Sequence, residues 1–256
     1  MGSGYRRALL KISGEALAGN RGHGIDPAKS AWIAAQIASA RRDGRELGIV
    51  IGGGNILRGV DAASVGVPPL VADRMGMVAT VINALAFQSA LEKVGERARV
   101  MCAFPVGRFV EEFEEGKARE YLAKGHIVIF AGGTGNPCFT TDSAAALRAV
   151  EIDAEVMVKC TQVKGIYDKD PKRFPDAVFF ERITPREVIE RRLGVIDAAA
   201  MDILARKLIL ALVINLHEDE NIRRALAGEE IGTTVQETAD LGTALERGTD
   251  DRRCAK

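Results

Sequence analysis

Short runs of branched apolar residues alternate along this chain with longer segments of helical periodicity, and this alternation restricts the fold more than any other feature. Strands that alternate with helices form βαβ units, in which the strands pair in parallel. The sequence therefore predicts an α/β fold with a mainly parallel sheet. The predicted strands are Ala8–Ile12, Leu47–Ile51, Ala98–Cys102, His126–Ala131, Glu155–Cys160 and Ile209–Ile214, and the predicted helices are Pro27–Arg42, Ala72–Val94, Lys117–Lys124, Ser143–Ile152, Pro185–Arg192 and Asp197–Lys207.

The chain has 35 basic and 35 acidic residues, and this balance predicts neither a nucleic acid nor an anionic membrane as its partner. No uninterrupted apolar run approaches the roughly 20 residues that span a bilayer, and Lys11 and Glu15 break the only apolar stretch near the N-terminus. We therefore expect a cytoplasmic protein with no membrane span and no signal sequence. The cysteines, which lack the spacing of a metal site or a disulfide framework, are Cys102, Cys138, Cys160 and Cys254.

No repeat and no low-complexity linker divides residues 1–236, which are predicted to form a single domain, although domain-size statistics alone also admit two small ones. Residues 237–256 are polar and charged and are predicted to form a tail. Ala72–Val94 carries few polar residues after Met75, which predicts a helix buried on several faces, partly in an oligomer. Gln162–Arg182 interrupts the alternation of strand and helix and is interpreted as an excursion over the ligand site.

Turns of glycine or other small residues follow four predicted strands, the position at which open α/β sheets bind ligands. The first turn, Lys11–Glu15, combines a lysine with backbone N–H groups that can face a phosphate, although a surface lysine beside a turn fits as well. The second turn, Gly52–Asn55, is followed by Arg58. Its glycines carry no Cβ atoms, so their backbone can approach oxyanions closely. A tight turn alone would also use glycines, but the arginine favours phosphate binding.

The third turn, Gly132–Asp142, is the most informative, because hydroxyl groups, the Asn136 amide and a helix N-terminus gather there. Capping of the helix by Thr141 or Asp142 would need only one such residue, so a ligand site is favoured. The fourth turn, Lys159–Pro171, contains an aromatic residue and an aspartate that can hold a nucleoside, although a plain hairpin is nearly as well supported.

No P-loop of the form G-x-x-x-x-G-K-[ST] is present, which excludes a Walker-type kinase, and the histidines lie outside the turns and give no Ser-His-Asp arrangement. Taken in order, the turns resemble the bacterial UMP kinases of the amino acid kinase family, from about Tyr5 to Gln236. The strings that carry the resemblance are Leu10–Leu17, Gly22–Asp26, Val50–Asn55, Asp73–Met77 with Ala79–Thr80, Gly132–Asp142 and Tyr167–Pro171.

This resemblance implies an amino acid kinase fold, a three-layer sandwich with a central, mostly parallel sheet between helices. It also implies transfer of the γ-phosphoryl group of ATP to UMP in pyrimidine nucleotide biosynthesis, with Mg²⁺ accompanying ATP. The N-terminal part of the domain would contact mainly UMP and other subunits, and the C-terminal part mainly ATP. The expected catalytic residues are Lys11, Asp142 and Asp197.

The resemblance further assigns the two substrates to residues of the four turns, with Asp73 at the ribose of UMP. The expected ATP-binding residues are Lys11, Ile12, Ser13, Gly14, Gly54, Arg58, Thr161, Tyr167 and Asp170. The expected UMP-binding residues are Gly53, Asp73, Thr134, Gly135, Asn136, Pro137, Cys138, Phe139, Thr140 and Thr141.

Members of this family are typically homohexamers that GTP activates and UTP inhibits, so the same assembly and regulation are expected here. The loop linked to GTP corresponds to Gly19, Asn20, Arg21, Gly22, His23 and Gly24. The chain departs from the family at three positions: Gln162 replaces a usual lysine, Lys164 a usual aspartate and Cys138 a usual aromatic residue. These departures rearrange charge beside the expected ATP site and alter the expected UMP loop.

Phosphoryl transfer requires mainly positioning and charge stabilisation from the protein. A phosphate monoester is already ionised at neutral pH, so Asp142 and Asp197 are expected to orient lysine, metal or water and not to act as bases. Two alternatives remain open at this point. The first is a kinase of an amino acid or of carbamate on the same fold, and the second is a non-catalytic nucleotide or oxyanion carrier.

Overall fold

A computed structural model describes residues 4–57 and 66–237 of the chain. Arg58 and nearly all of the predicted tail lie outside the described residues, and the division into one domain and a tail stays a prediction. The main sheet has nine strands in the order β4-β3-β5-β2-β1-β6-β10-β11-β9, and every pairing in it except β10 with β11 is parallel. Its strands are β1 (Arg7–Ile12), β2 (Glu46–Ile51), β3 (Ala98–Cys102), β4 (Glu111–Glu112), β5 (Ile127–Ala131), β6 (Val156–Thr161), β9 (Arg182–Ile183), β10 (Leu210–Asn215) and β11 (Thr233–Val235).

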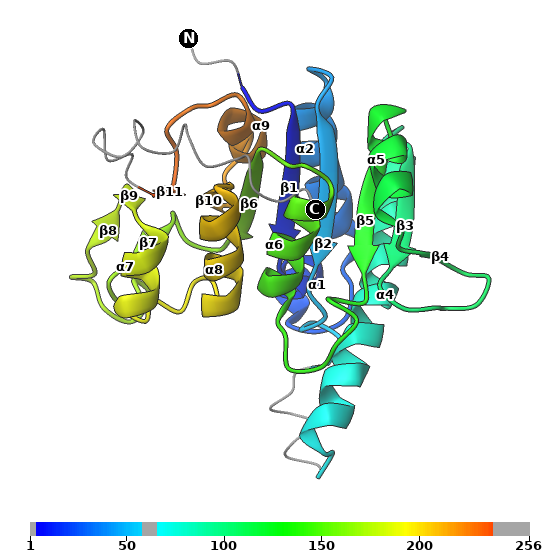
Figure 1. Cartoon of the computed structure of the whole chain (residues 1–256), viewed down its shortest axis with the longest axis horizontal. Coiled ribbons are helices and arrows are strands. Elements are labelled where there is room, and N and C mark those ends of the chain that lie inside the picture. The colour runs from blue at the N-terminus through cyan, green and yellow to red at the C-terminus, as the bar shows by residue number, and fades with distance from the viewer. Residues whose placement is uncertain (1–3, 58–65, 238–256) are drawn as a thin grey trace, which may run out of the picture.

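Helices cover both faces of this sheet, as Figure 1 shows. Along β1, Ala8, Leu10 and Ile12 join the core on one face and Leu9 joins the core on the other, as the alternation of side chains along a strand requires. The predicted three-layer sandwich is therefore confirmed. The first core is covered by α1 (Gly14–Ala18), α2 (Pro27–Arg41), α4 (Pro69–Lys93) and α9 (Asn221–Leu226), and the second by α5 (Glu115–Ala123), α6 (Thr141–Glu151), α7 (Pro185–Glu190) and α8 (Ala198–Lys207).

All six predicted strands are present, each within one residue of its predicted ends, and all six predicted helices are present with shifted boundaries. The sequence missed α1, α9, the 3₁₀ turn Gly19–Arg21 and the strands β4, β9 and β11. It also missed β7 (Ile166–Tyr167) and β8 (Phe179–Phe180), which pair antiparallel inside the segment that interrupts the alternation. That segment therefore contains a hairpin, as one interpretation of the fourth turn allowed, and its position over the ligand site stays a prediction. Elements this short carry no readable periodicity.

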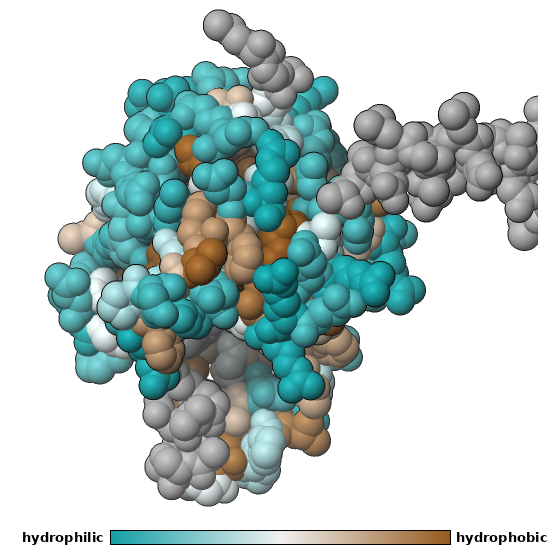
Figure 2. Space-filling model, turned by 90° about the vertical axis from the view of Figure 1, so that its left-hand side faces the viewer, coloured by the Kyte–Doolittle hydropathy of each residue, from teal (hydrophilic) through white to brown (hydrophobic). Residues whose placement is uncertain are grey.

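The helix α4 extends beyond the carboxyl edge of the sheet (Figure 1). Its 25 residues are long and apolar enough to cross a membrane by length and composition, a match that counting uninterrupted apolar residues missed. Within the chain, however, its second half is a core helix that buries Ala84, Phe87 and Leu91. Its first half buries fewer residues than predicted, and the protruding end carries apolar residues at the bottom of Figure 2. The exposed apolar residues of α4 are Leu70, Val71, Met75, Val78, Ile82 and Leu85.

The order of the strands brings the four glycine turns together. The turns follow β5, β2, β1 and β6, which are consecutive neighbours in the sheet and all run in parallel. Parallel neighbours end at the same edge, so the turns lie side by side along the carboxyl edge. Segments separated by more than a hundred residues thus form one surface.

Candidate active site

A buried cluster of two lysines and one aspartate lies where β1 and β6 end. Lys11 on β1 and Lys159 on β6 are direct partners in the parallel ladder, and both reach Asp142 in the first turn of α6. The Lys11 ammonium is 2.7 Å from Asp142 Oδ1. Lys159 donates to Asp142 Oδ2 and to the backbone carbonyl of Val195. The three side chains are only 10 to 12% exposed.

The charges of this cluster do not cancel, because two ammonium groups share one carboxylate. Burial alone would raise the pKa of Asp142, but the charges of Lys11 and Lys159 outweigh burial and hold the pKa below its ordinary value. Burial and the nearby Lys11 charge lower the pKa of Lys159. Asp142 therefore stays ionised, with a lysine facing each of its oxygens. It is placed to orient lysines and not to remove a proton.

The first and second turns touch each other beside this cluster. A Cβ atom on Gly14 would lie 2.4 Å from both the Gly52 carbonyl oxygen and the Asn55 side-chain oxygen, so only glycine fits there. The Gly52 N–H donates to the Ile12 carbonyl oxygen at 3.0 Å. Within residues 4–57 and 66–237, the N–H groups of Gly53 and Gly54 donate to no backbone carbonyl. Such unpaired amides beside an ammonium form a place for an anion.

The third turn forms a pocket with the start of α4 and the triglycine turn. This cavity has a volume of about 180 Å³. Seven of the ten expected UMP-binding residues line it: Gly53, Asp73, Thr134, Asn136, Pro137, Phe139 and Thr141. Gly54, expected at ATP, also lines it, so the pocket opens directly onto the triglycine turn. Thr80 and Met77 of α4 lie in the same wall.

The other three expected UMP residues support the pocket without lining it. The Cys138 N–H donates to Asp73 Oδ2 at 2.8 Å, with Cys138 in the left-handed region at φ 70°. Gly135, at φ 83°, lies against the backbone of Ala103. Thr140 caps α6 by accepting from the N–H groups of Asp142 and Ser143.

The alternative in which Thr141 or Asp142 only caps the helix is therefore wrong, since Thr140 has that role. Thr141 is left to line the pocket, and Asp142 is left to meet the lysines. The start of α6 is therefore maintained by Thr140, which neither lines the pocket nor belongs to the lysine cluster.

Asp197, the second expected catalytic aspartate, caps α8 and ties it to α6. Its carboxylate accepts from the Ala200 N–H at 2.8 Å, the Ser143 N–H at 3.1 Å and the Ser143 hydroxyl at 2.9 Å. The Thr140 hydroxyl donates to it as well. These contacts place Asp197 beside the first turn of α6, because its partner Ser143 directly follows Asp142 in the chain. Asp197 therefore also has a structural role.

The residues expected at the ATP nucleoside are spread over the β6 end and the hairpin. Thr161 Oγ1 donates to the Val163 carbonyl oxygen at 2.7 Å, and the ring of Tyr167 lies 5.3 Å from that of Phe179. Asp170 is exposed and accepts from the Lys172 N–H at 2.9 Å. None of these three residues lines the pocket beside the triglycine turn.

In the first turn, the side chain of Ile12 lies in the core, fully buried, so only its backbone can face a nucleotide. Ser13 caps α1, accepting from the Glu15 N–H at 3.3 Å. Of the residues that depart from the family pattern, Gln162 accepts from the Lys172 ammonium at 2.8 Å, and Lys164 lies 4.2 Å from the Phe179 ring centre.

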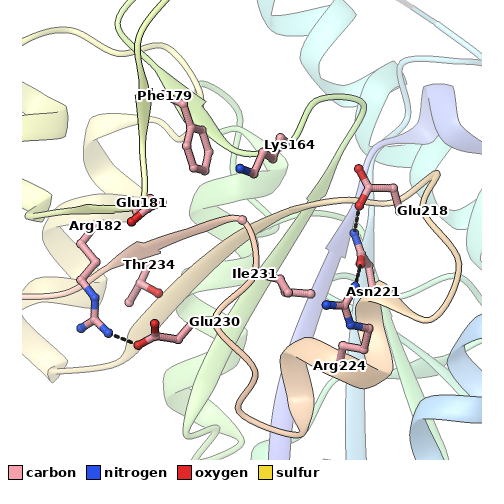
Figure 3. A pocket seen from close by; sticks show the side chains of 11 residues that line it. Lys164, Phe179, Glu181, Arg182, Glu218, Asn221, Arg224, Glu230, Ile231 and Thr234 are labelled. Atoms are coloured by element: carbon pink, nitrogen blue, oxygen red, sulfur yellow. Dashed lines mark hydrogen bonds and ion pairs between the residues drawn. The ribbon is translucent and has the colours of Figure 1, made fainter.

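Lys164 also lines a separate hollow of about 320 Å³ on the outer side of the hairpin, between β9, β11 and α9 (Figure 3). Its polar walls largely satisfy one another, since Arg182 pairs with Glu230 and Asn221 donates to Glu218 at 3.0 Å. None of the expected substrate-binding residues lines this hollow. It lies apart from the site that the turns form.

The expected effector loop, Gly19–Gly24, contains a 3₁₀ turn and is followed by Asp26, which caps α2 as expected. Its last residue is tied to the second turn, because the Gly24 N–H donates to the Asn55 carbonyl oxygen at 2.8 Å. Gly19 and Asn20 line a hollow together with Gln162 and His217, so this loop lies near the end of β6. Arg21, Gly22 and His23 are exposed.

Lys159 is the functional residue that the sequence did not single out as a site residue. A lysine inside the otherwise apolar strand Val156–Thr161 was the available signal. Among the described residues, no group of three His, Cys, Asp or Glu side chains could hold a metal ion by itself. Any divalent cation would therefore need ligands from a substrate, as Mg²⁺ commonly takes them from phosphates.

Residues 6–215 match the model of the amino acid kinase family, and the chain belongs to that family. Among its relatives, the uridylate kinase of Xanthomonas oryzae pv. oryzae is 50% identical over 91% of this chain and 97% of the relative. The uridylate kinase of Brucella melitensis is 48% identical over the same shares. The expected resemblance is thereby confirmed.

Solved structures agree with this assignment. The UMP kinase of Bacillus anthracis superposes with a TM-score of 0.89 at 34% identity, covering 92% of this chain and 98% of that one. The UMP kinase of Ureaplasma parvum gives a TM-score of 0.84 at 34% identity, over 93% and 100% of the two chains. The predicted amino acid kinase fold is therefore confirmed.

We predict that Lys159→Met lowers the free energy of unfolding by about 1.5–3 kcal/mol, the contribution of a hydrogen bond to a charged group. Urea unfolding measures the change, and Lys164→Met, the loss of an exposed lysine five residues along, should stay within about 0.5 kcal/mol of wild type. Because the pKa of Asp142 is lowered on folding, this stabilisation is complete above its ordinary value of 3.8 and is lost as the pH falls further. The difference between wild type and Lys159→Met should shrink on acidification; a constant difference would contradict the ion pair.

Proposed function

We propose that this chain is a UMP kinase that transfers the γ-phosphoryl group of ATP to UMP, giving UDP and ADP. The observation that carries the proposal is the position of the Lys11–Asp142–Lys159 cluster, next to the triglycine turn and beside a pocket lined by Asp73 and Gly132–Thr141 residues. The uridylate kinases to which the chain is similar support the choice of acceptor.

On the donor side, Lys11 and the backbone of Gly54 receive the ATP phosphates, with Arg58 following in the chain, whereas Gly53 faces UMP. We assign the adenosine to Thr161, Tyr167 and Asp170. Mg²⁺ enters with the ATP phosphates and, when bound, neutralises their charge. Asp142 and Asp197 already accept from lysines and from donors of α6 and α8, so the ion would take most of its ligands from its substrate.

On the acceptor side, the pocket between α4 and the third turn receives UMP. The Asp73 carboxylate lines this pocket, where its Oδ2 accepts from the Cys138 N–H, and we assign it to the ribose hydroxyls. Asn136, Thr134 and Thr141 supply an amide and hydroxyl groups. The small volume of the pocket, about 180 Å³, favours a nucleotide over a bulky protein substrate.

The chemical obstacle is the repulsion between two phosphates. Two unit charges 4 Å apart repel by about 4 kcal/mol at an effective dielectric constant of 20. The excess positive charge of the lysine cluster opposes that repulsion where the transferring group passes. Asp142 fixes the positions of both ammonium groups, and the already ionised UMP phosphate needs no base. No covalent intermediate is involved.

An ADP-release assay over a panel of acceptors tests this function. UMP should be used best among UMP, deoxy-UMP, CMP, dTMP, glutamate, aspartate and carbamate. A site that binds the ribose hydroxyls through Asp73 should also discriminate against deoxy-UMP, and Asp73→Ala should weaken UMP binding while sparing ATP. Preference for an amino acid or carbamate would establish the rival kinase, and ATP binding without ADP release would establish the carrier.

Lys11→Ala is expected to lower kcat far more than it raises the KM for UMP, because its ammonium acts on charge that develops during transfer. The expected loss is about 3 kcal/mol, or roughly 100-fold in kcat. Steady-state kinetics measures it, with exposed Lys207→Ala as the matched control. Activity within about twofold of wild type would show that Lys11 serves only the structure of the buried cluster.

We further propose that the chain assembles as a homohexamer through the exposed apolar face of α4. Val78 and Ile82 are 50% and 47% exposed in the single chain, and an apolar patch of this kind marks a contact between copies. Light scattering at micromolar concentration should give the mass of six chains. Replacing both residues by glutamate should lower that mass, whereas Val178→Glu on the hairpin should not. A stable wild-type monomer would overturn this assembly.

We also propose cytoplasmic action in pyrimidine nucleotide biosynthesis, with GTP as activator and UTP as inhibitor. GTP titrated at fixed ATP and UMP should raise turnover by a factor within roughly 5–150, the usual range of allosteric coupling. Gly22 has φ 75°, a backbone conformation that alanine adopts only with strain, so Gly22→Ala should reduce the activation. No neighbouring atom lies within 4 Å of an added Cβ, so basal turnover should be spared. Absence of any response in wild type would remove the regulatory assignment alone.

A further inference from the structure

Two polar side chains on α4 are buried against the carboxyl edge of the sheet. Thr80 is 3% exposed and Asn83 is fully buried, and they lie one helical turn apart on the same face. Their neighbours on that face, such as Ala84 and Phe87, are apolar core residues. Burying a hydroxyl and an amide costs free energy unless each finds partners, so the partners indicate why they are there.

Asn83 is bound to the second turn through its whole amide. Its Nδ2 donates to the Gly52 carbonyl oxygen at 2.7 Å and to Asn55 Oδ1 at 2.6 Å. In return, Asn55 Nδ2 donates to Asn83 Oδ1 at 3.0 Å and to the Gly24 carbonyl oxygen at 2.7 Å. Both amide groups therefore use both donors. The second turn is fixed to α4 by a closed pair of amides.

Thr80 is bound to the third turn in the same manner. Its Oγ1 accepts from the Gly132 N–H at 2.8 Å and donates to the Met77 carbonyl oxygen within α4 at 2.6 Å. Gly132 is at φ 80° and begins the turn that carries Thr134–Thr141. One helix thus holds the start of the proposed phosphate turn and the start of the proposed acceptor turn by two side chains three residues apart.

We propose that Thr80 and Asn83 are positioning residues for phosphoryl transfer: Asn83 orients the donor turn through Gly52, and Thr80 orients the acceptor turn through Gly132. Both side chains are uncharged and act through the turns that they hold, not on the transferring phosphate itself. Together they fix the distance between the two turns, and a misplacement of about 1 Å between reacting groups can cost 100-fold in rate. The inference rests on the proposed assignment of donor and acceptor to these turns.

A crossed pattern of binding losses tests the proposal. Asn83→Leu leaves the Gly52 carbonyl without its donor and should weaken binding of the non-hydrolysable ATP analogue AMPPNP with Mg²⁺ by roughly 10-fold. UMP binding should weaken by a clearly smaller factor, because Gly53 of the same turn lines the UMP pocket. Thr80→Val, an isosteric change, should do the reverse. Calorimetry measures both dissociation constants. Gln88→Leu, which removes an amide from the same helix away from both turns, is the matched control and should leave both unchanged.

Two further variants keep the test informative if a core variant does not fold. Thr80→Ser keeps the hydroxyl and should restore UMP binding, and Asn83→Ser, which is too short to reach Gly52, should repeat the selective loss of the ATP analogue. Equal losses for both ligands, or none, would overturn the proposal. Wild-type protein that binds both ligands but releases no ADP with UMP would overturn the proposed function instead, because the crossed pattern is read from binding alone.

Discussion

The register between β1 and β6 is the constraint on which the rest of the site depends. It places Lys11 opposite Lys159, so two ammonium groups leave the sheet side by side at its carboxyl edge. Such a pair would repel in a buried position, and Asp142 resolves this by accepting one lysine on each oxygen. A slip of one residue between these strands would send one lysine to the opposite face of the sheet. The positive charge at this edge is therefore set by backbone pairing before any loop is considered.

Everything else at the edge supports that arrangement. Thr140 caps α6 and so presents Asp142 at the correct end of the helix, and Asp197 ties α8 to the same turn. The surrounding glycines let the first two turns approach to contact beside the lysines. The site is thus formed by convergence of parallel strands, and each added element adjusts its geometry by a few hydrogen bonds.

The sequence predicted this architecture where a pattern was local and failed where a contact was distant. The runs around Leu9, Ile49 and Ile129 are apolar and end at glycine turns, so both strand and turn could be read directly. Strands of two or three residues have no period to detect. Lys159 was overlooked as a site residue because its partner lies 17 residues away on another element.

The polar residues of α4 show the same limit. Thr80 and Asn83 interrupt an apolar helix, but their partners, Gly132 and Gly52, belong to turns that are separated from them by about 30 to 50 residues. Periodicity identifies which face of a helix is buried and is silent on hydrogen bonds across the core. The start of α4 was also placed three residues late, although Pro69 at its first position is typical of a helix start.

Thr80 and Asn83 anchor α4 to the two turns, and the residues before them form the protruding part of the helix. At about 1.5 Å per residue along the helix axis, Asp73 lies about 10 Å from Thr80 toward the N-terminus of α4, and Leu70 lies about 15 Å from it. A tilt of α4 about Thr80 and Asn83 would move each residue of the protruding part in proportion to its distance from Thr80. The two turns bound to Thr80 and Asn83 would move little. A contact made by the exposed apolar residues of α4 would therefore fall on the same stretch of helix as Asp73, which accepts from the Cys138 N–H.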